Sequence, residues 1–261
     1  MLDEIKALPP LPSSVVRIQE LCMSNDTDIE ELSRVIESDP MLSANILKSV
    51  NSPLYGMSKK ISSIPQAVML FGTSMIRGFA AANAIKKAVT IDLSPYGKTI
   101  DDVGRTSMMQ SALAREWYRT VDKSMLPLLQ SSAFLMELGK LVASLKVIGS
   151  GEFDKFSSKV GQGKPLMEIE RCYLGNTSYE IASIMFEHWN FETALTDTLR
   201  EIGNPETKNP YAMVLSVVAK AINLRDALSE QALQEAREMI EQFGLNRNAF
   251  DEAVDAIKSK K

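Results

Sequence analysis

Apolar residues recur at three- and four-residue spacing along almost the whole chain, and this helical period restricts the fold more than any other feature. In the segment 27–40, for example, Ile29, Leu32, Val35 and Ile36 fall on one face of a helix. No stretch shows the sustained apolar–polar alternation of a half-buried strand, and no repeat of fixed period occurs. The sequence therefore predicts an all-α protein.

Residues that cap helices divide this pattern into segments. Gly72 and Gly244 follow apolar stripes and are predicted to be left-handed helix ends. Long helical patterns extend over roughly 99–120 and 125–147. The predicted N-terminal caps are Thr27 (a capping box with Glu30), Asp39 before Pro40, Ser63 (with Gln66), Ser74, Thr177 (with Glu180), Asn209 before Pro210, Ser229 and Asn248.

Length and charge restrict the class of protein. The chain has 261 residues, 45% of them hydrophobic, and a formal net charge of −4. A mildly acidic surface argues against nucleic acid as the main partner, because binding to phosphates needs basic residues. The charged start MLDEIKALPP does not resemble a signal peptide, and no apolar run approaches the ~18 residues of a membrane span. We therefore expect a cytoplasmic protein with no membrane association.

The sequence offers few residues for familiar catalytic or metal sites. His188 is the only histidine, and it lies at a predicted helix end, which is the position of an ordinary hydrogen-bonding histidine. Cys22 and Cys172 are far apart and are expected to be free, buried thiols. A zinc site needs three or four Cys or His ligands, so a structural zinc is not expected. A magnesium or manganese site made only of carboxylates stays open, since 33 acidic residues are present.

The first third of the chain contains three distinctive blocks, 8-LPPLP-12, 36-IESDPMLSANILKSVNSPLYG-56 and 61-ISSIPQAVMLFG-72. In order and spacing these blocks resemble the HDOD domain, a bacterial signalling module related to the HD superfamily of metal-dependent phosphohydrolases. The resemblance implies a multi-helical bundle over residues 1–203. With turn-rich breaks at 92–98 and 203–210, we expect an N-terminal helical lobe (1–96), an HD-like lobe (97–203) and a C-terminal helical extension (204–261).

The resemblance also implies where a metal would lie in the catalytic relatives. The paired His-Asp of those enzymes matches Met136 and Glu137, in 133-AFLMELGKLVAS-144. Their first histidine matches Gln110, and a later one matches Ser178. Thioether, amide and hydroxyl groups replace imidazoles poorly around a hard metal centre, so no metal cofactor is expected. Glu137 would then be a buried carboxylate, with Lys140 three residues on as its candidate partner.

A second group of residues matches an HDOD signature in the N-terminal lobe: Asp39, Pro40, Asn51, Ser52, Tyr55 and Gly56. Clusters of Asn, Ser, Pro and Gly form turns, so this loop is interpreted first as a connection between two helices. The other interpretation is that the loop and the adjoining helix ends form a docking surface.

The resemblance implies a non-enzymatic regulatory protein of bacterial signal transduction. It would bind a protein partner or a small nucleotide second messenger, through a helical surface or the degenerate HD cleft, and would need no cofactor. The alternative is a divergent phosphohydrolase whose metal site consists of Glu137, Glu180, Asp197 and Glu201.

Overall fold

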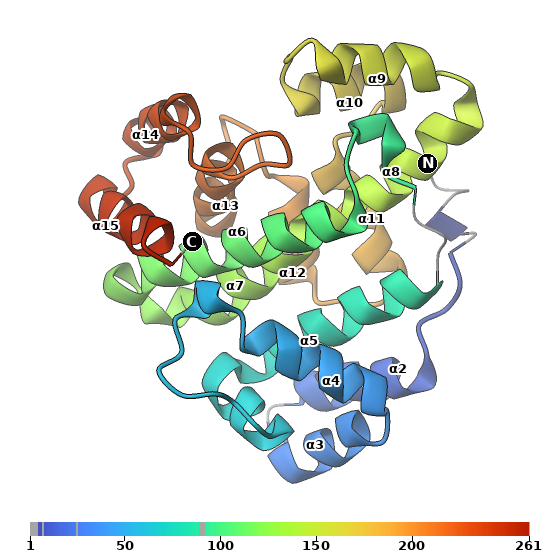
Figure 1. Ribbon diagram of the computed structural model, residues 1–261, viewed down its shortest axis with the longest axis vertical. Helices are drawn as coiled ribbons and strands as arrows, with labels where there is room; N and C mark the ends of the chain where they lie inside the picture. The colour runs from blue at the N-terminus through green and yellow to red at the C-terminus, as the bar shows by residue number, and fades with distance from the viewer. Residues whose placement is uncertain (1–4, 7, 25, 89–91, 261) are drawn as a thin grey trace.

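The structure is a computed structural model that describes residues 5–6, 8–24, 26–88 and 92–260, and within them it is helical with no strand. Figure 1 shows α6 and α7 crossing the middle of the molecule, with α2–α5 below them and α8–α10 above. The α-helices are α2 (Ser13–Met23), α3 (Ile29–Glu37), α4 (Pro40–Val50), α5 (Ile64–Ala88), α6 (Ile100–Val121), α7 (Leu126–Leu135), α8 (Gly139–Ser150), α9 (Phe153–Gly161), α10 (Leu166–Leu174), α11 (Ser178–His188), α12 (Thr193–Arg200), α13 (Pro210–Ala221), α14 (Glu230–Phe243) and α15 (Arg247–Lys258). Short 3-10 turns lie at η1 (Pro53–Tyr55), η2 (Ser94–Tyr96), η3 (Lys123–Met125) and η4 (Met136–Leu138). The predicted all-α class is confirmed.

Most predicted helix starts are confirmed, and three are wrong. Thr27 and Asn248 miss the cap by one or two residues, and Ser74 lies inside α5, where no new helix begins. Asp39 accepts hydrogen bonds from the backbone of the first turn of α4, as predicted. The cap of α3, however, is Asp28 and not Thr27, whose hydroxyl instead donates to carbonyls at the end of α2. The cap of α15 is Asn246 and not Asn248. Neighbouring cap-forming residues compete for one position, and sequence spacing alone does not decide between them.

Helix α5 bends at Gly72, which has φ 76° and ψ 163°. The sequence predicted that Gly72 ends a helix, but the chain resumes a helical path at once. Glycine tolerates this backbone conformation because it has no Cβ. Among the described residues, α5 is the one helix long and apolar enough to cross a membrane, and 67% of the apolar window is buried inside the protein.

The expected continuous helix over 125–147 is interrupted. Helix α7 ends at Leu135, the 3-10 turn η4 follows, and α8 begins at Gly139. Gly139 directly follows the interruption, but the apolar pattern continues on both sides of it, and an isolated glycine is tolerated inside a helix. The tighter turn lies in the segment that the resemblance matched to the metal-binding pair.

The C-terminal helices pack on the rest of the chain through α6. The Trp117 ring of α6 is fully buried and stacks edge-on against Phe250 of α15, with ring centroids 5.1 Å apart. Its indole nitrogen donates to the Asn246 carbonyl at 3.0 Å. Figure 1 shows α13–α15 on one side of α6, with the described C-terminal end near η1. The predicted boundary at residue 203 stays a prediction, although the hydrophobic core is continuous across it.

A partly buried ion pair and two hydrogen bonds join α2 and α5 to the turn between α11 and α12. The Arg77 side chain of α5 pairs with Glu192 and lies over the Phe191 ring, 5.1 Å from its centroid. The Gln19 amide of α2 donates to the carbonyls of Trp189 and Asn190 at 3.0 and 2.8 Å. These contacts fix α2 and α5 against the turn that connects α11 to α12.

Candidate functional site

The four positions matched to metal ligands lie together in the protein interior, and all four are without solvent exposure. Gln110 comes from the middle of α6, Met136 and Glu137 from η4, and Ser178 from the first position of α11. Three elements that are distant in sequence therefore supply the site. The sequence placed these residues by resemblance alone, and in the fold Gln110 bonds to Glu137 while Ser178 bonds to Lys140.

A close approach between two helices makes this arrangement possible. At Gly139 a Cβ atom would lie 1.8 Å from the Ser178 carbonyl oxygen and 2.7 Å from the Ala182 nitrogen. Only glycine fits here, because α11 lies directly on its Cα atom. Thr177 and Glu180 form the predicted capping box and fix the start of α11. Ser178 is thereby held against the residues that follow η4.

A hydrogen-bonded ion pair links the site residues. The Lys140 ammonium lies 2.8 Å from Glu137 Oε2 and 2.9 Å from Ser178 Oγ, so the ion pair expected from the sequence is present. The Gln110 amide nitrogen donates to Glu137 Oε1 at 2.8 Å and to the Ile222 carbonyl at 2.9 Å. The Tyr179 hydroxyl is 3.4 Å from the same Oε1. Each Glu137 oxygen is thus matched by a donor or a positive charge.

Glu170 is a second buried carboxylate, which the sequence analysis missed. Its Oε1 accepts a hydrogen bond from the Tyr96 hydroxyl at 3.0 Å, and its Oε2 accepts one from the Ser178 backbone at 2.7 Å. Burial raises the pKa of Glu170, although Lys140 and these hydrogen bonds oppose the shift. The Glu170 residue lies within an ordinary amphipathic helix, so no local pattern distinguishes it from a solvated acid.

The charge of Lys140 is stabilised inside this cluster. Burial lowers the pKa of the Lys140 ammonium, but the nearby carboxylates of Glu137 and Glu170 outweigh burial and raise it overall. Burial also raises the pKa of the Tyr96 and Tyr179 hydroxyls, and the two carboxylates raise it further. The lysine is therefore charged and both phenols are neutral near pH 7.

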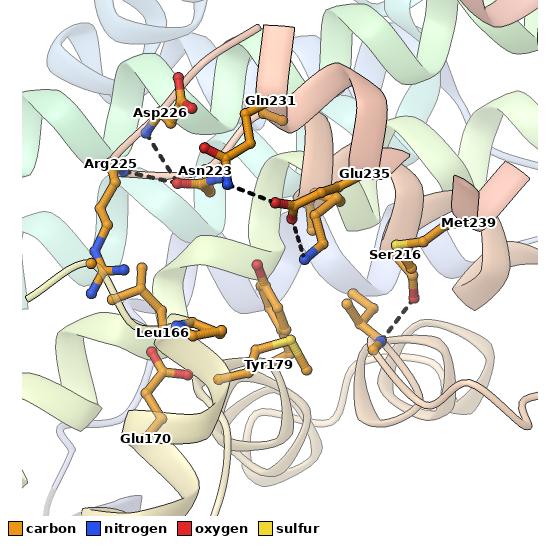
Figure 2. Close-up of a pocket in the computed structure, with 18 of the residues that line it drawn as sticks. Leu166, Glu170, Tyr179, Ser216, Asn223, Arg225, Asp226, Gln231, Glu235 and Met239 are labelled. Carbon is orange, nitrogen blue, oxygen red and sulfur yellow. Dashed lines mark hydrogen bonds and ion pairs between the residues drawn. The ribbon is translucent and has the colours of Figure 1, made fainter. Parts of the chain in front are cut away.

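A pocket of about 590 Å³ opens beside this cluster. Lys140, Glu170 and Tyr179 line one side of it, as Figure 2 shows for the two residues labelled there. The opposite side consists of residues from α13, α14 and the turn between them, including Asn223, Gln231 and Glu235 (Figure 2). The C-terminal segment therefore forms a wall of the pocket.

Hydrogen bonds hold the pocket's far wall in place. The Arg225 guanidinium donates to the Val160 carbonyl at 2.7 Å and to the Lys164 carbonyl, which ties the α13–α14 turn to the loop after α9. Lys220 forms an ion pair with Glu235 at 3.0 Å, and this pair links α13 to α14. Six charged side chains line the pocket. Three are positive (Lys140, Lys220 and Arg225) and three are acidic (Glu170, Asp226 and Glu235).

The donor set does not suit a catalytic metal. Within the described residues no group of three or more His, Cys, Asp or Glu side chains is placed to hold an ion. Besides one carboxylate, the matched positions supply an amide, a thioether and a hydroxyl, and the carboxylate is already paired with Lys140. The residues present therefore do not fit the dinuclear centre of the hydrolytic relatives.

The acidic residues of the alternative hydrolase hypothesis serve separate structural roles. Glu180 caps α11 and pairs with Arg171 at 2.9 Å. Asp197 pairs with the exposed Arg200 at 3.2 Å. Glu201 accepts a hydrogen bond from the Thr207 hydroxyl. The structure does not bring these side chains to Glu137.

The remaining candidates for chemistry lie apart from the cluster. His188 is exposed in the last turn of α11. Both cysteines are free, as expected, but the expectation that they are buried is wrong for Cys172, which is exposed, and only partly right for Cys22. The sequence pattern did not predict that Cys172 is exposed. On the same short helix the charged Glu170, two residues earlier, is buried.

The HDOD signature loop is held by the Asn51 side chain. Its amide nitrogen donates to the carbonyls of Leu47 and Ile61 at 2.7 and 2.8 Å, and its oxygen accepts from the Ile61 backbone at 2.8 Å. Asn51 thus joins the end of α4 to the chain ten residues later. This geometry supports the interpretation of the loop as a structural connection.

The rest of the loop is also anchored. Tyr55 is buried and packs edge-on against Phe71, with centroids 4.9 Å apart. Gly56 has φ 61°, and a Cβ there would lie 2.8 Å from the Lys260 side chain. Ser52, Gly56 and neighbouring residues line a second, shallower hollow of about 370 Å³, so part of the loop faces solvent.

The sequence profile of the HDOD domain matches residues 8–205. The chain belongs to the HDOD family. Its fold is shared with solved bacterial proteins. A provisionally assigned phosphohydrolase of Shewanella amazonensis SB2B superposes with a TM-score of 0.76 at 19% identity, over 99% of this chain and 94% of that chain. An HDOD domain protein of unknown function from Geobacter sulfurreducens superposes with a TM-score of 0.61 at 16% identity, over 100% and 95%.

Two further relatives extend the comparison. A virulence factor of Campylobacter jejuni subsp. jejuni superposes with a TM-score of 0.58 at 24% identity, over 99% of this chain and 95% of that chain. An uncharacterised protein of Treponema pallidum (strain Nichols) is 22% identical over 225 residues, which are 84% of this chain and 42% of that protein. The chain thus spans less than half the length of that curated relative. These likenesses show a common HDOD fold.

We expect Gly139→Ala to lower the free energy of unfolding by about 3 kcal/mol or more, because the new methyl group would overlap backbone atoms of α11. Urea denaturation measures this loss. The control is Gly149→Ala on the same helix, where a Cβ meets nothing within 4 Å. That variant should gain up to about 1 kcal/mol from helix propensity. Equal stability of the two variants would contradict the close approach.

Asn51→Ala removes three hydrogen bonds to the backbone and should cost about 1–3 kcal/mol of unfolding free energy. The same measurement on Ser52→Ala is the control, because the Ser52 side chain makes no cap hydrogen bond in the structure. If Asn51→Ala is as stable as the wild type, the amide does not hold the loop.

Glu170 should make stability depend on pH. A carboxyl group whose pKa is raised in the folded state stabilises the fold fully below its unfolded value of 4.5, and this stabilisation is lost as the pH rises through the folded pKa. Glu170→Gln removes the titration and keeps an acceptor for Tyr96. We expect the unfolding free energy of the wild type to fall relative to that of Glu170→Gln as the pH rises above 4.5. Chemical denaturation of both proteins at several pH values tests this, and a difference that is constant with pH would refute it.

Proposed function

We propose that this HDOD protein is a non-enzymatic, cytoplasmic regulator of bacterial signal transduction that acts by binding. The observation that carries the proposal is the pairing at the degenerate site. Gln110, Glu137 and Ser178 bond to one another or to Lys140, in the place where the catalytic relatives hold metal. A carboxylate that is already paired with a buried lysine is poorly suited to bind and release a hard metal ion during turnover.

The pocket beside the site supports binding as the mode of action. Its volume of about 590 Å³ lies within the range of small-molecule sites. Its walls come from the HD-like lobe and the C-terminal helices, so an occupant would contact both. Occupancy could then be transmitted to the outer surface through α13 and α14, where a protein partner would detect it.

The charges on the pocket walls favour some ligands over others. Three positive and three negative side chains line it, and the two lysines are paired with Glu137 and Glu235. A polyphosphate needs positive charges that are free to pair with it. The pocket therefore suits a ligand that carries both donors and acceptors better than a nucleotide rich in phosphate.

A hydrolysis assay tests the proposal against the alternative of a divergent phosphohydrolase. Purified protein is incubated with bis(p-nitrophenyl) phosphate and Mn²⁺ or Mg²⁺, and the release of nitrophenol is followed. We expect no release above that of buffer with the same metal. Release that is abolished by EDTA would contradict the proposal. Its loss in Asp197→Asn, a change at an exposed residue, would assign the activity to the carboxylate-only site.

A further inference from the structure

One long segment of the sequence is opposite in charge to the rest of the protein. From residue 40 to residue 91 no acidic residue occurs, although the chain as a whole has a formal net charge of −4. Two basic residues of this segment are matched in the fold, Arg77 by Glu192 and Lys87 by Asp39. Its other basic residues are all exposed: Lys48, Lys59, Lys60 and Lys86.

Two of the exposed lysines meet at a hollow in the surface. Lys59 and Lys60 line the hollow of about 370 Å³ in the HDOD signature loop. The other lining residues lie between Asn51 and Met57, and none of them is acidic. Among the residues that the structure describes, neither lysine forms an ion pair. The hollow therefore presents two positive charges that the described part of the fold leaves unmatched.

A third lysine borders the same hollow. The Lys260 side chain lies against Gly56, where a Cβ atom would be 2.8 Å from it. The Lys260 ammonium is 3.2 Å from Glu116, and Glu116 also pairs with Arg119 at 2.7 Å. The carboxylate behind this edge of the hollow is thus already neutralised by two cations. Figure 1 shows the described C-terminal end close to η1, in agreement with this contact.

The hollow also offers apolar contact and a fixed shape. Pro53 is exposed, and Met57 is half-buried against the core. A methionine side chain adapts to apolar groups of different shape. The three Asn51 hydrogen bonds hold the loop in one conformation, so the surface is formed before anything binds to it.

We propose that this hollow docks an acidic segment of a protein partner. Carboxylates of the partner pair with Lys59 and Lys60, and an apolar side chain between them contacts Met57. This inference goes beyond the proposed function, because that proposal places an occupant in the pocket beside Lys140 and not at the signature loop.

The charge distribution favours an acidic protein segment over a nucleic acid. The affinity of a nucleic acid depends on many phosphate contacts, and here three lysines border the hollow. A long polyanion would also extend over the rest of the protein, which is acidic overall. A short acidic segment avoids this repulsion, because salt screens charges beyond about 10 Å.

Fluorescence anisotropy tests the docking site with a defined peptide. The probe is fluorescein-labelled Gly-Glu-Glu-Leu-Glu-Glu-Gly, and the same peptide with glutamine in place of each glutamate is the neutral control. We expect saturable binding of the acidic peptide alone. Raising the NaCl concentration from about 50 to about 500 mM should weaken this binding severalfold, because salt screens exposed charges. Absence of saturable binding, or equal binding of both peptides, would overturn the proposal.

Two double variants locate the site. Lys59→Glu/Lys60→Glu reverses both charges of the hollow and should weaken peptide binding about tenfold or more. Lys86→Glu/Lys87→Glu makes the same change in net charge at the end of α5, within the same acid-free segment, and should change the affinity by no more than about twofold. Equal losses in the two variants would show that only overall charge matters, which contradicts a docking site.

A labelled thymidine oligonucleotide of the same length as the peptide tests the other class of partner. We expect it to bind more weakly than the acidic peptide. Tighter binding of the oligonucleotide, lost in Lys59→Glu/Lys60→Glu, would replace the proposal with a nucleic-acid site. Thermal unfolding confirms that each variant is folded, and Lys59→Gln/Lys60→Gln, which should also weaken binding, is used if the charge reversal unfolds the protein. Failure of these binding experiments would leave the hydrolysis assay of the proposed function unaffected.

Discussion

A buried carboxylate beside a buried ammonium is the interaction on which the centre of this protein depends. Neither Glu137 nor Lys140 is appreciably exposed, so each needs the other: an isolated charge in this interior would cost several kcal/mol. The ion pair also requires polar side chains beside it. Gln110 reaches it from α6, and Ser178 reaches it from α11 only because Gly139 lets that helix come close. The contacts that stabilise the buried charges therefore depend on the close packing of α11 at Gly139.

The pairing also accounts for a buried carboxylate at a position whose neighbours are not metal ligands. The fold match to a provisionally assigned phosphohydrolase extends over nearly the whole chain, while the matched ligand positions carry amide, thioether and hydroxyl groups. Loss of a metal would leave Glu137 without a counter-charge. Lys140, one helical turn later, supplies the counter-charge that the buried carboxylate requires.

The sequence predicted the helices well because their signals are local. Caps such as Asp39 and Ser229 and the apolar stripes between them depend on a few neighbouring residues. The interruption at η4 was missed, and it lies next to Gly139, where α11, which is distant in sequence, packs on the chain. Glu170 was missed for the same reason. Its burial depends on Tyr96 and Ser178, and only the family resemblance placed any of the site in advance.

The C-terminal helices lie almost wholly beyond the residues matched by the family profile, yet they form one wall of the pocket. The cluster around Lys140 belongs to the shared part, whereas Asn223, Gln231 and Glu235 do not. A relative with a different C-terminal segment would thus keep the pocket wall formed by Lys140, Glu170 and Tyr179 and have a different opposite wall. A change in this terminal segment would therefore alter one wall of the pocket, and through the Ile222 carbonyl it would also reach Gln110, which donates to Glu137.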